Sequence, residues 1–280
     1  MSINVLHINS FYKSISKEKF SKEKFRLQKE LLKLQEWIIK NNKRIAIVFE
    51  GRDAAGKGAA IRLITQHLNN KYFRVEELGK PTEKQNRNWF NTFYKILPKK
   101  GELVFFDRSW YSRALIQPTM GYCSSNQYDY FMRNVLDWEQ KIKNDGVIII
   151  KFYLSIDKST QNKRFNIRKN HALKYWKLSK NDINSIAYWE ELSGYKNRMF
   201  SLTSTENDPW IIVNSNNKVI AQLNCIRYLL DKFKYDKKKQ LSPKKWTSTV
   251  NDRDIEIMGV KFYELNDDQY QLLSMIRHSL

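Results

Sequence analysis

The sequence has few residues that could build a disulfide framework or a metal cluster. Its two cysteines, Cys123 and Cys225, lie in unrelated contexts without CxxC spacing, and its four histidines form no ligand pattern. We expect both thiols to be buried structural groups rather than catalytic ones. Neither disulfide pairing nor cysteine chemistry is therefore expected to define this protein.

The sequence also lacks a long hydrophobic run and a secretion signal. No stretch reaches the roughly 18 apolar residues that a membrane span requires. The N-terminus, MSINVLHINSFYKS, has no basic-then-apolar layout of a signal peptide. We therefore predict a cytoplasmic protein with no membrane partner.

Acidic residues are a minority, and this imbalance points to an anionic partner. The chain has 50 Lys and Arg against 29 Asp and Glu, which gives a formal net charge of +21. Such a charge implies nucleic acid, a membrane surface or a highly phosphorylated small molecule. A hydrophobic fraction of 41% over 280 residues is ample for one large α/β domain or two smaller ones.

The hydrophobic pattern predicts an α/β fold. Within an N-terminal segment 1–44, residues 17–44 place Leu27, Leu31, Leu34 and Ile38 at helical spacing, which predicts an amphipathic helix. From residue 45 to 232, short apolar runs alternate with helical segments, which predicts a parallel sheet with helices on both faces. The expected strands are 45–49, 72–78, 103–106, 147–154 and 211–213. Residues 233–280 look like an ordered extension or an oligomer contact.

A glycine-rich stretch between the first expected strand and the next helix predicts a phosphate site. Residues 51–57, GRDAAGK, fit the pattern G-x-x-x-x-G-K in its required context. Backbone N–H groups and the helix N-terminus wrap a phosphate in such loops, and Lys57 reaches a neighbouring one. The other expected phosphate contacts are Arg52, Ala54, Ala55, Gly56, Gly58 and Ala59.

The residue after Lys57 is a glycine, Gly58, so the hydroxyl that commonly binds Mg²⁺ in such loops is missing. A carboxylate must then take a larger share of holding the metal. Asp53, inside the loop, and Asp107, at the end of the 103–106 strand, are placed for this role. Asp53 could instead be only a turn former.

A second group of residues, FDRSWYSR at 106–113, follows that strand. It places an acid and two arginines at the sheet edge where open parallel sheets bind ligands. Arg108 and Arg113 carry the guanidinium fork that suits phosphate. An Asp107–Arg108 structural pair is the alternative, and Trp110 and Tyr111 are expected to pack.

A third group, residues 161–182, is densely basic. Arg164 and Arg168 are four residues apart and share one helix face. Because so many positive charges repel one another without an anion, we predict a mobile lid at about 160–182 that closes on phosphates. Its further candidate phosphate ligands are Lys163, Lys174 and Lys177. Ser179 and Asp182 fit a capping box for the next helix.

Taken together, the sequence resembles the family-2 polyphosphate kinases, P-loop enzymes that move phosphoryl groups between inorganic polyphosphate and nucleotides. The matching stretches occur in family order over roughly residues 20 to 232, and family members also carry the glycine after the loop lysine. They are EGRDAAGKG at 50–58, KPTE at 80–83, LPKKGELVFFDRSWYSRA at 97–114, MGYC at 120–123, QNKRFNIR at 161–168, KYWKLSKND at 174–182 and RMFSLTSTENDPW at 198–210.

The resemblance implies a three-layer P-loop kinase fold with a basic helical lid, and a homo-oligomer. It implies Mg²⁺-dependent, reversible phosphoryl transfer from polyphosphate to ADP or GDP, which yields ATP or GTP. A basic channel past Lys80 and Arg113 would carry the polymer. The residues that match catalytic positions of the family are Asp53, Lys57, Asp107, Arg108, Arg164 and Arg168.

Two other functions compete with this interpretation. A nucleoside monophosphate kinase of the thymidylate or adenylate type, with ATP as donor, shares the loop and lid but needs no charge of +21. A basic nucleic-acid-binding protein explains the charge but not the paired acids and the loop. We therefore expect no nucleic acid as partner.

Overall fold

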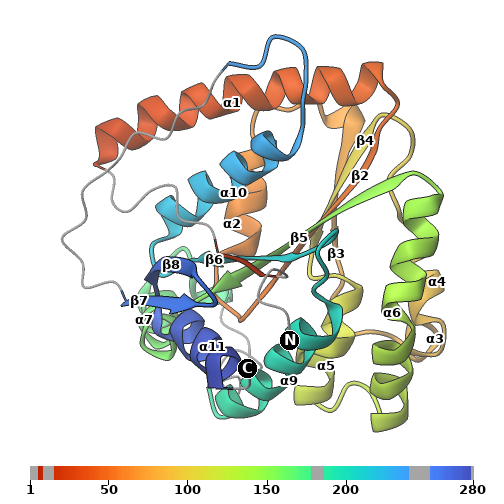
Figure 1. Cartoon of the computed structure of the whole chain (residues 1–280), viewed down its shortest axis with the longest axis vertical. Coiled ribbons are helices and arrows are strands. Elements are labelled where there is room, and N and C mark those ends of the chain that lie inside the picture. The colour runs from red at the N-terminus through yellow and green to blue at the C-terminus, as the bar shows by residue number, and fades with distance from the viewer. Residues whose placement is uncertain (1–5, 9–15, 178–185, 240–252, 279–280) are drawn as a thin grey trace.

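The computed structural model describes residues 6–8, 16–177, 186–239 and 253–278 (Figure 1). The strands are β1 (Leu6–Ile8), β2 (Arg44–Gly51), β3 (Phe73–Glu77), β4 (Glu102–Asp107), β5 (Val147–Ser155), β6 (Trp210–Asn214), β7 (Arg253–Ile257) and β8 (Val260–Leu265). The helices are α1 (Lys17–Lys40), α2 (Lys57–Thr65), α3 (Glu83–Arg87), α4 (Trp89–Tyr94), α5 (Ile116–Thr119), α6 (Ser125–Asn144), α7 (Lys158–Asn170), α9 (Trp189–Thr203), α10 (Lys218–Lys232) and α11 (Asp267–His278), with short 3-10 helices η2 (Asn70–Tyr72), η3 (Trp110–Ala114) and η4 (Tyr175–Lys177).

Six strands form one parallel sheet in the order β1-β6-β5-β2-β4-β3. Strand β2 lies between β4 and β5, with Phe49 paired to Asp107 and Gly51 paired to Leu154. Because parallel strands end at the same edge, the segments that follow β2, β4 and β5 meet there. These segments are the glycine loop, the Arg108 turn and the start of α7.

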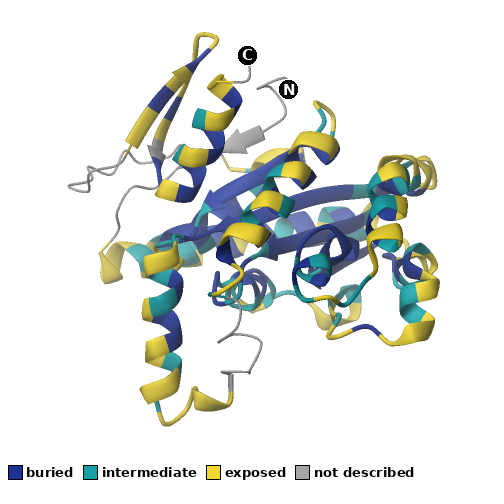
Figure 2. Ribbon diagram, turned by 90° about the horizontal axis from the view of Figure 1, so that it is seen from below, coloured by how far each residue is buried: buried dark blue, intermediate teal, exposed yellow. Residues whose placement is uncertain are grey.

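Both faces of the sheet are buried, which gives three layers. Successive side chains of a strand point to opposite faces. In β2, Ile45, Ile47 and Phe49 pack with helices α1, α2 and α10, whereas Ala46 and Val48 belong to the core shared with α4, α6 and α9. Figure 2 shows the dark blue sheet with helices on either side. The predicted α/β fold is thus confirmed.

Two details of the fold were not predicted: strand β1 and the form of the expected C-terminal extension. Strand β1 adds a short parallel edge beside β6, ahead of the predicted N-terminal helix. The C-terminal part forms an antiparallel hairpin, β7–β8, followed by α11. Ile255, Phe262 and Leu273 of this part belong to the same buried core as α6 and α9.

The structure tests the expectation for the cysteines but not the one for the capping box. Cys225 is buried as expected, but Cys123 is partly exposed, so its predicted burial is wrong. The side chain of Cys123 borders a polar pocket instead. Ser179 and Asp182 lie outside the described residues. None of the described helices is long and apolar enough to cross a membrane.

Candidate active site

The glycine loop between β2 and α2 depends on backbone conformations that side chains disfavour. Gly51 has a φ of 139°, and a Cβ there would lie 2.5 Å from the backbone oxygen of Leu154. Gly56 has a φ of 111°, and Ala54, which is not a glycine, has a φ of 63°. The loop therefore turns tightly against β5.

Part of the loop backbone donates to no acceptor among the residues that the structure describes. The N–H of Ala55 donates to the Arg52 oxygen at 3.1 Å, and the N–H of Ala59 donates to the Gly56 oxygen at 3.1 Å. Within the described part of the chain, the N–H groups of Ala54, Gly56, Lys57 and Gly58 are among those of the loop and first helical turn that donate to no protein acceptor. Such groups at a helix N-terminus are suited to an anion.

Lys57 begins α2 and folds back over the loop. Its ammonium donates to the Gly51 oxygen at 2.9 Å and to the Arg52 oxygen at 3.3 Å, and the side chain is buried. An ammonium has three donors, so a third remains for a ligand. The predicted lysine thus lies over the backbone of the glycine loop.

Asp53 and Arg108 form an ion pair across the site, between the loop and the end of β4. Burial alone would raise the pKa of Asp53, but the charges of Arg108 and Lys57 outweigh it and hold that pKa below its usual value. Arg108 has a φ of 69°, and its N–H donates to the Phe49 oxygen at 3.0 Å. This left-handed turn brings its side chain to Asp53.

Asp107 lies beside Gly58. A Cβ on Gly58 would be 2.9 Å from the Asp107 Oδ2 atom and 3.5 Å from Arg62 Nη1. The 2.9 Å separation is shorter than a Cβ contact allows, so the Asp107 side chain would have to shift. The glycine that replaces the usual hydroxyl residue therefore leaves room for the carboxylate.

A buried carboxyl, Glu50, was missed by the sequence reasoning. It accepts hydrogen bonds from the N–H and the Oγ of Ser109, both at 2.8 Å. Burial raises the pKa of Glu50 to about 6, although Ser109 and Lys57 act in the opposite direction. Glu50 fixes the turn that carries Arg108. Glu50 directly follows the apolar run 45–49, and this position could have indicated a buried acid. A buried acid needs hydrogen-bond partners.

The two arginines of α7 lie in different environments. Arg164 is buried and donates to the backbone oxygens of Ala54 at 2.8 Å, Ala55 at 3.1 Å and Ser215 at 2.5 Å. Burial, followed by the charge of Arg168, lowers the pKa of Arg164 to about 10. The charge of Arg168 in turn helps to lower the pKa of Asp53. Arg164 thus supports the loop from behind, while Arg168 acts electrostatically on the site.

The side chain of Arg52 points away from the loop backbone. It donates to Ser193 Oγ at 2.6 Å and to the Trp189 oxygen at 3.2 Å, and its guanidinium lies 3.5 Å from the centre of the Trp189 ring. These contacts tie the loop to α9. Any phosphate contact of Arg52 would therefore come from its backbone.

The remaining basic candidates are spread along the chain. Arg113 is buried, lies 4.4 Å from the centre of the Trp89 ring and donates to Asn86 Oδ1 at 2.9 Å. Lys80 is exposed near Tyr122, whose backbone oxygen accepts from Asn86. A third set lies on or after α7: Lys163 and Lys174, which are exposed, and Lys177, in η4. The described contacts join Arg113 to the Lys80 region but not to α7.

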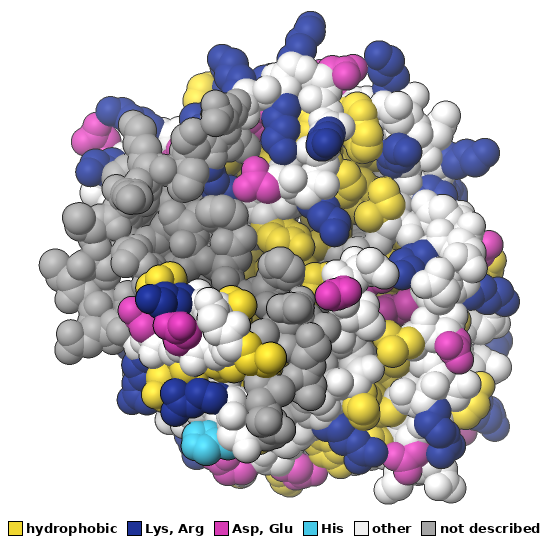
Figure 3. Space-filling view, viewed as in Figure 1, with side chains coloured by type: hydrophobic (Ala, Val, Ile, Leu, Met, Phe, Trp, Pro, Cys, Tyr) yellow, Lys and Arg dark blue, Asp and Glu magenta, His cyan; other side chains and the backbone are white. Residues whose placement is uncertain are grey.

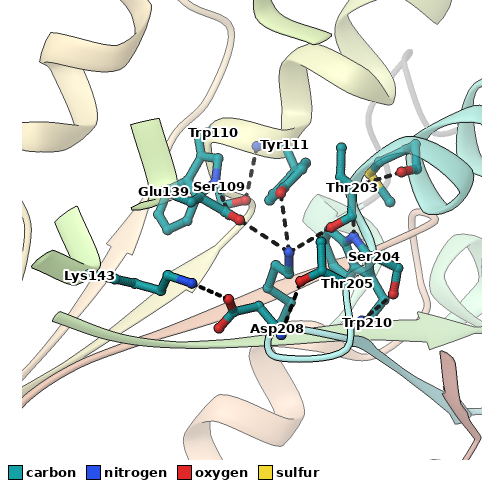
Figure 4. Close-up of polar contacts among 12 residues, drawn as sticks. Ser109, Trp110, Tyr111, Glu139, Lys143, Thr203, Ser204, Thr205, Asp208 and Trp210 are labelled. Carbon is teal, nitrogen blue, oxygen red and sulfur yellow. Dashed lines mark hydrogen bonds and ion pairs between the residues drawn. The ribbon is translucent and has the colours of Figure 1, made fainter. Parts of the chain in front are cut away.

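A buried polar network lies under η3 (Figure 4). Lys151 of β5 donates to Glu139 at 3.2 Å, to the Tyr111 hydroxyl at 3.3 Å and to the Thr203 oxygen at 2.9 Å. Trp110 donates to the other oxygen of Glu139 at 3.0 Å. Trp110 and Tyr111 are fully buried, which confirms that they pack. The network holds the residues that follow Arg108 in place.

Comparison with known proteins decides the family. The model of the Polyphosphate kinase 2 (PPK2) family matches residues 14–241. The chain belongs to the polyphosphate kinase 2 family. A GDP-polyphosphate phosphotransferase of Mycolicibacterium smegmatis is 45% identical over 220 residues, which cover 78% of each chain. An ADP-polyphosphate phosphotransferase 1 of Rhizobium meliloti is 38% identical over 250 residues, 89% of this chain and 81% of the relative.

Solved structures of the polyphosphate kinase 2 family also resemble this fold. Polyphosphate kinase 2 from Arthrobacter aurescens aligns with a TM-score of 0.74 at 26% identity, over 81% of this chain and 84% of that one. The family confirms the expected class of enzyme, a kinase that transfers phosphoryl groups between polyphosphate and nucleotides. It does not favour the nucleoside monophosphate kinase or the nucleic-acid-binding protein.

Proposed function

We propose that this chain transfers the terminal phosphoryl group of inorganic polyphosphate to the β-phosphate of ADP or GDP, with Mg²⁺ as cofactor. A β-phosphate oxygen forms the new P–O bond while the terminal phosphoanhydride bond of the polymer breaks. The polymer leaves one phosphate shorter. Because one phosphoanhydride replaces another, the reaction is reversible. The relatives named for ADP and for GDP support both acceptors.

The N–H groups of the glycine loop that have no acceptor among the described residues carry this proposal. Together with the third donor of Lys57, they would bind the phosphates of the donor chain. Arg108 and Arg168 would neutralise charge on the transferring group, since phosphoryl transfer asks the protein mainly for positioning and charge stabilisation. Arg164, which is held by backbone oxygens, would support the loop.

Asp53 and Asp107 fit an Mg²⁺ site. In kinases this ion is usually held by one or two carboxylates, with water and phosphate oxygens completing its shell. Asp53 follows β2 and Asp107 ends the adjacent strand β4. When bound, Mg²⁺ would supply positive charge that offsets the charge of the phosphates. Asp53 would then share its carboxylate between the ion and Arg108.

The polymer is proposed to follow the basic side chains of Lys80, Lys163, Lys174 and Lys177 beyond the loop. Arg113, which is 1% exposed, would add positive charge beneath this path rather than a direct contact. In Figure 3, the Lys and Arg side chains on the visible face are spread over it rather than gathered in one patch. That distribution suits an extended polyanion better than one small ligand. The expected homo-oligomer and cytoplasmic location stay predictions.

The test is the appearance of ATP or GTP when the purified protein, Mg²⁺ and long-chain polyphosphate are mixed with ADP, GDP or AMP. We expect polyphosphate-dependent formation of the triphosphate from ADP or GDP, and loss of product when EDTA is added. Phosphorylation of AMP by ATP, without any response to polyphosphate, would contradict the proposal.

A further inference from the structure

Helix α11 begins on the edge of the sheet that carries the active site. Asn266 donates to the Ser155 oxygen at 3.2 Å, and Gln269 donates to the Ile212 oxygen at 3.3 Å. Ser155 ends β5, and Ile212 lies in β6. This helix lies outside residues 14–241, which the family model matches. A part of the chain beyond the matched region therefore covers the carboxyl end of two central strands.

The first turn of α11 contributes a buried charge, Asp268. Its carboxylate forms an ion pair with Lys196 of α9 and accepts from Ser155 Oγ at 2.6 Å. Lys196 is 2% exposed and Asp268 is 7% exposed. A buried pair of this kind is costly to desolvate, and removing one partner leaves the other charge buried and uncompensated. The pair therefore fixes α11 against α9 and β5.

The same helix reaches the glycine loop through α9. Arg52 of the loop donates to Ser193, which lies one turn before Lys196. Burial would raise the pKa of Asp268, but the charge of Lys196, with a smaller contribution from Arg52, holds it below its usual value. The Asp268 carboxylate is thus electrostatically linked to the loop.

Asp268 also touches the base of the lid helix. Its N–H donates to Asp157 Oδ1 at 3.3 Å, and Asp157 Oδ2 accepts from Asn216 at 2.6 Å. Asp157 is the residue before α7, yet its side chain caps no N–H of that helix. Its carboxylate instead joins α7 to the loop after β6 and to α11. Helix α7 carries Arg164 and Arg168, so this junction lies at the point about which the lid would move.

We propose that the β7–β8 hairpin and α11 act as a clamp that sets the position of the lid helix relative to the glycine loop, with Asp268 as its positioning residue. In this role Asp268 touches no substrate and acts through Asp157 and Lys196. The consequence for turnover rests on the proposed function. The mechanical link itself does not, because it concerns how firmly α7 is held.

The experiment compares hydrogen exchange and kinetics in Asp268→Asn and Asp157→Ala. Asp157 is only partly buried, so its variant keeps the proposal testable if Asp268→Asn does not fold. The matched control is Asp267→Asn, which removes the exposed pair of the neighbouring residue with Arg253. We expect backbone amides of residues 158–170 to exchange about tenfold faster in both test variants, while those of α6 and the control stay unchanged.

Kinetics provides the second readout. Because small displacements of catalytic groups are costly, kcat with polyphosphate should fall by about tenfold or more in the test variants, with a smaller change in KM for the nucleotide. The double variant should be no worse than the poorer single one, since both act on one junction. Exchange in α7 equal to that of the control, in folded test variants, would overturn the clamp. Altered exchange in a protein without polyphosphate activity would keep the clamp and reject the proposed function.

Discussion

The Asp107 carboxylate occupies the space that a side chain on Gly58 would need: a Cβ there would lie 2.9 Å from Asp107 Oδ2. The serine or threonine that such loops usually carry after the lysine would therefore need part of the space that the Asp107 carboxylate occupies. We infer that Gly58 and the strand-end carboxylate form a matched pair, in which the residue without a side chain leaves room for an acid that would hold Mg²⁺.

The pair can be tested with Gly58→Ser. The added hydroxyl offers a ligand, but the Cβ displaces Asp107, so we expect kcat to fall by about tenfold or more and the requirement for Mg²⁺ to rise. Steady-state rates over a range of Mg²⁺ concentrations measure both. Gly194→Ala is the control, because a Cβ there meets nothing within 4 Å. A Gly58→Ser enzyme with wild-type rates would refute the matched pair.

Lys57→Ala removes the ammonium that spans the loop. We expect kcat to fall by about a hundredfold or more, as when one preorganised donor to a transition-state oxygen is lost. Lys141→Ala, a change on the exposed end of α6, serves as the charge-matched control. If turnover survives in Lys57→Ala, the lysine does not bind the transferring phosphates.

Gly51→Ala tests the loop backbone. The φ of 139° is a glycine conformation, and the new Cβ would meet the Leu154 oxygen at 2.5 Å, a rigid backbone atom. We expect a loss of about 3 kcal/mol or more in the free energy of unfolding. Gly146→Ala, at a φ of 85° with open space around it, should lose only about 1 to 2 kcal/mol. Equal losses measured by urea unfolding would show that steric contact with β5 is unimportant.

The loop and the strands could be predicted from the sequence because their signals are local. The spacing of Gly51, Gly56 and Lys57, and the apolar run before them, place a strand, a turn and a helix N-terminus without knowledge of the remainder. Asp107 was found for the same reason, since it ends an apolar run. Its contact with Gly58 depends on the pairing of β2 with β4, which only the fold shows.

Other features depend on contacts between distant segments. Arg52 belongs to the glycine motif, yet its partners Trp189 and Ser193 come from a helix more than a hundred residues later. Strand β1 has only three residues, too few for a periodic signal, and pairs with β6. The hydrogen bonds of Asp268 likewise join the C-terminal helix to β5 and α7. No spacing in the sequence encodes these partners.

Glu50 gives the pH dependence that the sequence did not predict. Burial raises its pKa from 4.5 to about 6, so the folded protein binds its proton more tightly than the unfolded chain does. The resulting stability is fully present below about pH 4.5 and is lost as the pH rises through about 6.

Glu50→Gln cannot titrate but keeps one oxygen for Ser109. The free energy of unfolding of the wild type, minus that of Glu50→Gln, should therefore fall by about 2 kcal/mol between about pH 4 and pH 7. Chemical unfolding at several pH values measures it, with Glu36→Gln on the exposed face of α1 as control. A difference that stays constant over this range, as expected for the control, would show that Glu50 does not carry its raised pKa in the folded protein.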